Sequence, residues 1–186
     1  MDINVLVNIT AKAWSLPILA ALHDGVVGRQ APLLAATGAN RTSFAQSLGH
    51  LIEIGLVERN PGYGHPLRPE FRLTETGQEA AAFAHRIYKK EEPLLRRSWT
   101  VPVLATLDQP QHFSGIRKRL VRITDRALSQ SLKSMEKSGW IARDISQEMW
   151  PPRPLYRAVN AGGALTKVIA PVVSFGVTPE TATVPV

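Results

Sequence analysis

The side chains of this sequence that could bind a partner are mainly the cations Lys and Arg, and their excess over Asp and Glu lies in its second half. Residues 93–186 hold 13 Lys and Arg against 6 Asp and Glu, whereas residues 1–92 hold 9 of each. The net charge of +7 on this chain of 186 residues therefore lies entirely after residue 92. Such an excess favours a polyanionic partner, either nucleic acid or an anionic membrane surface, with improved solubility as the alternative.

Other kinds of chemistry find little support in the residue types and their spacing. The absence of Cys excludes disulfides, thiolate metal sites and cysteine nucleophiles, and makes the cytoplasm the expected location. The five His are scattered without metal-ligand spacing, and no Ser lies in the strand-turn-helix elbow of a hydrolase. No apolar run approaches the ~18 residues of a membrane span, and residues 1–10 lack the features of a signal peptide. We therefore expect no enzyme activity, no metal, no cofactor and no membrane partner.

An internal repeat organises the chain. A shift of 85 positions, or of 84 in the middle of the module, superimposes identical residues: Trp14 on Trp99, Pro17 on Pro102, Leu19 on Leu104, Gln46 on Gln130, Gly55 on Gly139, Arg72 on Arg157 and Gly77 on Gly162. So long a period indicates two whole domains rather than a solenoid. We predict one domain at 1–92, a second at 93–175, and a tail at 176–186 that is flexible or forms an added edge strand.

Both copies show the same order of predicted elements. In the first copy, helices are expected at 11–23, 31–36, 40–55 and 74–90, with strands at 56–59 and 71–73. In the second copy, helices are expected at 98–107, 114–121, 125–137 and 163–173, with strands at 140–143 and 155–159. Three helices, a hairpin and a trailing helix are the elements of a winged helix-turn-helix. The predicted fold is mainly α with small β-hairpins (α+β), as two tandem winged helix-turn-helix domains that form a pseudo-dimer.

Several motifs add a family resemblance. Trp14 and Trp99 each precede an Ile/Val-Leu helix, and the stretch from Ile123 to Leu132 reads Ile-Thr-Asp-Arg-Ala-Leu-Ser-Gln-Ser-Leu. A further motif covers the hairpin, or wing, and the start of the helix after it, and each copy keeps a different part of this motif. The second copy has Pro151-Pro152 and Tyr156, and the first has Leu-Thr-Glu-Thr-Gly at 73–77. Both copies thereby resemble HxlR-type winged-helix transcription regulators, over about 160 of the 186 residues. The resemblance implies a bacterial-type regulator that binds specific double-stranded DNA as a repressor or an activator.

The sequence also departs from that family's pattern. The family has one such domain per chain and works as a homodimer, so two copies in one chain imply a covalently fused pseudo-dimer, either alone or as a homodimer. Some members sense electrophiles through a cysteine, which this chain lacks.

The helix at 125–137 is the predicted recognition helix. The spacing of Leu128, Leu132 and Met135 makes them its buried stripe. The residues expected to face the major groove, with Arg suited to guanine and Gln to adenine, are Arg126, Ser129, Gln130 and Lys133. The residues expected to contact phosphates are Arg117, Lys118, Arg119 and Arg122 of the preceding helix and Arg153 of the wing. The alternative is that these cations form only a solvated helix face.

The corresponding helix of the first copy has fewer polar side chains at the positions expected to face DNA. Thr42, Ala45, Gln46 and Gly49 occupy the four reading positions there. Arg41 and Arg68 are further candidates for phosphate contact. We expect this copy to bind DNA weakly or not at all and to serve in pairing, ligand sensing or spacing. The alternative is that it reads a half-site through its backbone, Thr42 and Gln46.

Two functions stay open at this stage. The first is a sequence-specific regulator whose second copy is the main reader of DNA. The second is a winged-helix module for protein interaction or ligand sensing, with only weak, non-specific DNA binding. A small-molecule effector is compatible with either function, and the space between the domains or around Trp14 and Trp99 is the expected pocket.

Overall fold

The computed structural model describes residues 1–60, 69–88, 92–146 and 152–175. It is mixed α and β, with small antiparallel sheets, as predicted. In chain order the elements are α1 (Ile3–Thr10), α2 (Ser15–His23), α3 (Gln30–Thr37), α4 (Arg41–Glu53), β1 (Val57–Asn60), β2 (Glu70–Leu73), α5 (Glu75–Ile87), η1 (Pro93–Arg96), α6 (Thr100–Ala105), β3 (Gln111–His112), α7 (Phe113–Arg119), α8 (Asp125–Lys137), β4 (Ile141–Ser146), β5 (Arg153–Ala158), α9 (Asn160–Ile169) and η2 (Ala170–Val172). Of the residues named above, Arg68, Pro151 and the tail at 176–186 lie outside the described ranges.

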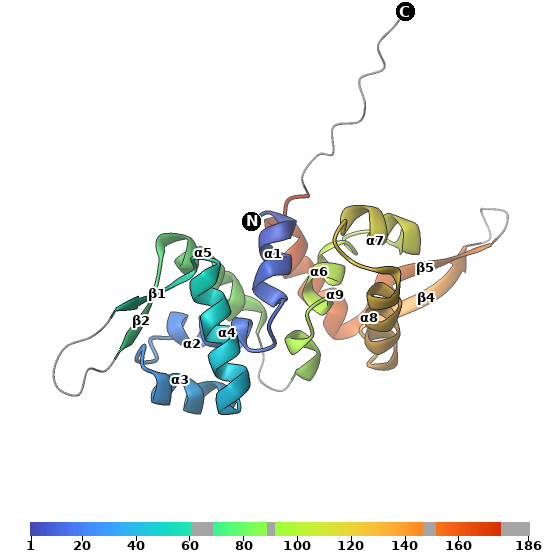
Figure 1. Ribbon diagram of the computed structural model, residues 1–186. Helices are drawn as coiled ribbons and strands as arrows, with labels where there is room; N and C mark the ends of the chain where they lie inside the picture. Colours follow the sequence, from blue (N-terminus) through green and yellow to red (C-terminus); the bar gives the residue numbers. More distant parts are fainter. Residues whose placement is uncertain (61–68, 89–91, 147–151, 176–186) are drawn as a thin grey trace, which may run out of the picture.

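The molecule is elongated, with one hairpin at each end. Figure 1 shows the pair β1–β2 at one end, the pair β4–β5 at the other, and α1, α6 and α9 between them. β1 pairs antiparallel with β2, and β5 lies between β3 and β4 in the second sheet. The helices α4 and α8 lie on opposite sides of a common centre (Figure 1).

Residues 15–87 and 100–169 present closely similar sequences of elements. Each runs through three helices, a hairpin and a further helix, and the second adds only the short strand β3. The third helix ends in each case at a glycine with positive φ, +74° at Gly55 and +69° at Gly139. That conformation is open to glycine without the steric penalty of a Cβ, which explains why this residue recurs at the offset of 84.

The ends of several helices differ from the sequence prediction. The prediction of a helix that begins at residue 11 is wrong, because residues 11–14 form a turn and α2 starts at Ser15. Pro17 then lies in the first turn, where its missing N–H removes no helical hydrogen bond. The last helix starts at Asn160, and Pro171 falls in the 3₁₀ turn η2 after α9 has ended.

The sequence prediction also missed α1, which packs at the centre of the molecule. Leu6 and Ile9 are fully buried on this helix, which contacts both α6 and α2. A short parallel bridge holds its start, because the N–H of Ile3 donates to the carbonyl of Ser174 at 2.9 Å. The buried apolar side chains from both parts of the chain form one continuous cluster. The two halves of the chain are thus packed around a shared core.

Candidate nucleic-acid interface

The helix α8 is fixed by a cap at each end and one buried face. Thr124 begins it, since its Oγ1 accepts a hydrogen bond at 3.2 Å from the backbone N–H three residues later. Gly139 follows its end in the left-handed conformation. Leu128, Leu132 and Met135 are all at most 2% exposed. The caps and the buried stripe together determine which face of α8 is turned to solvent. The bounds of α8 match the predicted helix at 125–137.

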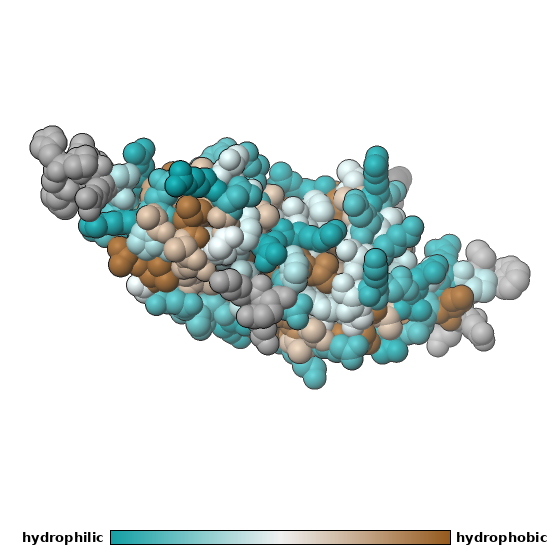
Figure 2. Space-filling view, turned by 90° about the horizontal axis from the view of Figure 1, so that it is seen from below, coloured by the Kyte–Doolittle hydropathy of each residue, from teal (hydrophilic) through white to brown (hydrophobic). Residues whose placement is uncertain are grey.

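The opposite face of α8 carries the predicted reading residues. Arg126, Ser129, Gln130 and Lys133 are all exposed. Within the described part of the chain, none of these four side chains forms a hydrogen bond or an ion pair. Figure 2 shows hydrophilic side chains over the half of the molecule that carries α8, whereas the larger hydrophobic areas lie over the other half. The polar groups of α8 are therefore available to an external partner.

Two cations of α7 have partners inside the protein. Arg117 donates from Nε to Asp125 Oδ1 at 3.1 Å, and this ion pair joins α7 to the first turn of α8. Arg119 donates to Asp108 Oδ1 at 2.7 Å and to a backbone carbonyl. The sequence predicts phosphate contacts for both residues, and in the structure both are also partly exposed and paired with a carboxylate.

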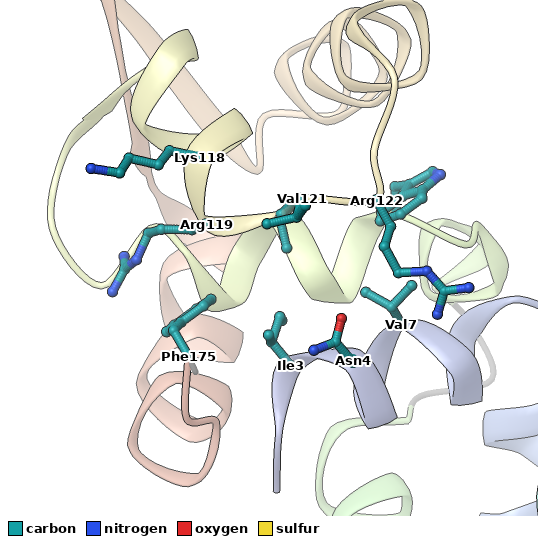
Figure 3. Close-up of a pocket in the computed structure, with 10 residues that line it drawn as sticks. Ile3, Asn4, Val7, Lys118, Arg119, Val121, Arg122 and Phe175 are labelled. Carbon is teal, nitrogen blue, oxygen red and sulfur yellow. The ribbon is translucent and has the colours of Figure 1, made fainter. Parts of the chain in front are cut away.

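Next to α7, a cavity lies against α1 (Figure 3). Arg122 donates to Asn8 Oδ1 of α1 at 3.0 Å, while Lys118 is exposed. The cavity has a volume of about 210 Å³, and Figure 3 shows side chains from α1, from residues 118–122 and from Phe175 around it. Its walls are formed by Ile3, Asn4, Val7, Trp99, Lys118, Arg119, Leu120, Val121, Arg122 and Phe175.

In the first half of the chain, α4 is built like α8 but has different surface chemistry. Asn40 Oδ1 accepts a hydrogen bond from the N–H of Ser43 at 2.8 Å. The buried stripe consists of Phe44, Leu48 and Leu51, at the positions of Leu128, Leu132 and Met135. The candidate contacts exposed on α4 are Arg41, Thr42 and Gln46. Arg41 is the only Lys or Arg in this helix, so its outer face carries less positive charge than that of α8.

The remaining candidate, Arg153, begins β5 and is exposed. It lies opposite Ser146 in the register of β4 and β5, at the end of the hairpin where the chain passes from β4 to β5. The structure also brings together three cations that sequence reasoning missed, Lys12, Arg96 and Arg97, beside α8. The offset of 85 residues pairs Lys12 with Arg97 and was the signal that could have identified two of them.

Within the described ranges, no group of three His, Asp or Glu side chains could hold a metal ion. No single described helix is long and apolar enough to cross a membrane, although α1 and α2, bent by 100°, pass the same test as a pair.

Comparison with known proteins finds a family match in the second half of the chain. A sequence model of the HxlR-like helix-turn-helix family matches residues 94–180. YvaP of Bacillus subtilis, named an HTH-type transcriptional regulator, is 31% identical over 83 residues, which cover 44% of this chain and 76% of that protein. An HTH-type transcriptional regulator of Methanothermobacter thermautotrophicus is 34% identical over 79 residues, which cover 42% of this chain and 60% of that protein. A third HTH-type transcriptional regulator, from Mycobacterium tuberculosis, is 35% identical over 75 residues, which cover 40% of this chain and 47% of that protein.

Among solved structures, the reduced form of the transcriptional regulator YodB from Bacillus subtilis aligns with a TM-score of 0.37 and 23% identity. The alignment covers 52% of this chain and 83% of YodB.

Proposed function

This chain belongs to the HxlR-like helix-turn-helix family, and we propose that it is a transcription regulator that binds specific sites in double-stranded DNA. The observation that carries the proposal is the outer face of α8, where Arg126 and Gln130 are exposed without partners inside the described chain. In helix-turn-helix proteins the second helix enters the major groove, where Arg can bind guanine and Gln adenine through two hydrogen bonds. We assign this reading role to α8, with the protein in the cytoplasm alongside the chromosome.

The first experiment measures binding of the full chain to a duplex selected from genomic fragments and to a random duplex, over a range of salt concentrations. We expect binding to the selected duplex to be at least about a thousandfold tighter, and to fall steeply as salt rises. The absence of any preference among genomic fragments would count against the proposal.

We further propose that the chain is a covalent pseudo-dimer of two winged helix-turn-helix domains, at 1–92 and 93–175. The paired caps of α4 and α8 and the paired glycines at 55 and 139 support this arrangement. One chain would then span an imperfect inverted repeat, with half-sites about one helical turn apart. Footprinting combined with the mass of the complex distinguishes this footprint from the longer one of a dimer of chains.

The two copies are expected to contribute unequally to binding. Replacing Arg41 and Gln46 together by alanine should cost less affinity for the specific duplex than replacing Arg126 alone. The physical reason is that α4 carries one cation, and that Ala45 and Gly49 have no polar side chain to contact DNA. The double replacement therefore removes fewer base and phosphate contacts. Binding titrations of the variants on one duplex measure this difference. A loss from the double replacement as large as that from Arg126→Ala would overturn the asymmetric arrangement.

A second candidate function is a ligand-sensing or protein-interaction module with weak, non-specific DNA binding. The cavity between α1 and the end of α7 favours it, because Ile3 and Val7 supply apolar walls and Lys118 a cation (Figure 3). A small apolar anion is the effector that such walls would accept. In that case the chain binds the selected and the random duplex equally well, and the first experiment separates the two functions.

A further inference from the structure

A cationic groove lies between the turn after α1 and the recognition helix α8. Its lining includes Lys12 from the turn after α1, Arg96 at the end of η1, Arg97 directly after η1, and Gln130 of α8. The volume of this groove is about 400 Å³. Its lining contains three Lys and Arg and no Asp or Glu, so the groove attracts anions. Gln130, a proposed base-reading residue, forms part of the same wall.

The groove lies at the centre of the proposed DNA-binding face, between α4 and α8. On the α4 side, the N–H of Trp14 donates to Ser47 Oγ at 3.3 Å, and His50 Nε2 lies 2.8 Å from the carbonyl oxygen of Asn8. On the other side, the same turn shares the groove with residues of α8. Figure 1 shows the end of α1 and the short helix at 93–96 in the space between α4 and α8.

Contacts between distant parts of the chain hold together the segments that line the groove. Thr10 Oγ1 donates to the carbonyl of Ser98 at 2.7 Å and is 3% exposed as a residue. The guanidinium of Arg96 lies over the Trp14 ring, 5.0 Å from its centroid. These contacts hold together the two backbone segments that carry the cations and position the guanidinium of Arg96, which lowers the entropy lost when a ligand binds.

Lys12 and Arg97 occupy equivalent positions, two residues before Trp14 and Trp99. Both are exposed, and within the described residues neither side chain forms a hydrogen bond or an ion pair. The internal repeat thus supplies one cation from each copy to the same central surface.

We propose that this groove binds the phosphate backbone of the DNA segment between the two half-sites. The inference rests on the proposed function, because it gives a phosphate-binding role to the centre of a DNA-binding face that has α4 on one side and α8 on the other. When a recognition helix occupies the major groove on each side of the centre, the intervening backbone passes across the middle of the protein. Phosphate contacts there position the protein without reading sequence.

The test is the double variant Lys12→Gln/Arg97→Gln in the full chain, compared with the control Arg86→Gln/Lys167→Gln. The control changes the net charge equally and removes exposed cations of α5 and α9, neither of which lines the groove. Binding to the selected and the random duplex is measured at several salt concentrations. Because each neutralised phosphate contributes about 0.9 to the slope of log K against log salt, the test variant should lower that slope by about 1.8 on both duplexes. The control should leave the slope nearly unchanged.

Two outcomes would overturn the proposal. One is a test variant whose slope matches that of the control, and the other is a loss confined to the selected duplex, which would indicate base reading. Thermal unfolding of both variants should match the unmodified chain, since the replaced side chains are exposed. Failure of the proposed function is distinguishable, because it appears in the unmodified chain as equal affinity for the two duplexes.

Discussion

Replacing Arg126 by alanine is expected to weaken binding to the specific duplex about tenfold to a hundredfold. A bidentate arginine–guanine contact contributes ~1–3 kcal/mol of discrimination against the wrong base, and that contribution is lost with the guanidinium. The fold should be unaffected, because Arg126 is exposed on α8 and has no partner inside the described chain. Equilibrium titrations against the specific duplex and against duplexes changed at one base pair measure both affinity and specificity.

The matched control is Arg86→Ala, which removes an exposed arginine of α5, far along the chain from α8. It should change affinity only slightly and should preserve the ranking of the duplexes. For Arg126→Ala, the discrimination at one base position should relax while the other positions stay selective. A variant that binds every duplex equally less well, with its ranking intact, would assign Arg126 to phosphate contact and not to base reading.

Replacing Gly162 by alanine is expected to lower the free energy of unfolding by about 1–3 kcal/mol or more. Gly162 lies in the first turn of α9, where a Cβ would collide with the carbonyl oxygen of Trp140 and lie 2.9 Å from its carbonyl carbon. Flexible side chains could move aside, but this neighbour is backbone and is itself fixed, because its oxygen accepts a hydrogen bond from the N–H of Val159 at 2.9 Å. Urea unfolding of the variant and of the unmodified chain measures the difference.

The control for this prediction is Gly49→Ala in the interior of α4. Apart from adjacent residues and the neighbouring backbone of α4 itself, no atom of the described chain lies within 4 Å of the Cβ that it would add. Alanine there should stabilise the helix by about 0.5–1 kcal/mol, because glycine loses more backbone entropy on folding. Opposite signs for the two replacements are therefore expected. Equal behaviour of the two would mean that α9 does not approach the start of β4 as closely as described.

The same close approach recurs in the first half of the chain. A Cβ on Gly77 would collide with the carbonyl oxygen of Leu56, which occupies the position equivalent to Trp140 at the offset of 84. The sequence repeat thus reflects a packing requirement between the trailing helix and the first strand of each hairpin. We expect Gly77→Ala to destabilise the chain for the same reason as Gly162→Ala.

Local signals were sufficient to predict α8 and its exposed face. A capping Thr124, apolar residues at spacings of four and three, and Gly139 after the last turn together specify where the helix begins, which side is buried and where it ends. The same kinds of signal give α4, with Asn40 as its cap. They depend only on residues a few positions apart, so they can be read from the sequence.

The helix α1 could not be predicted in this way. It spans only eight residues, and an isolated helix of that length is unstable in water. Its stability comes from burial of Leu6 and Ile9 against other helices and from the bridge to Ser174, which lies at the opposite end of the described chain. These partners are absent from any local window of sequence.

The sequence by itself therefore determined the helix faces, the repeat and the concentration of charge in the second copy, because these follow from periodicity and composition. Only the tertiary structure decided which cations are available to a partner. Arg117 and Arg119 are paired with acidic side chains 8 and 11 residues away, whereas Lys12 and Arg97 come together across 85 positions. The physical reason is that a side chain's partners are set by the packing of whole helices, which brings together residues that no local pattern relates.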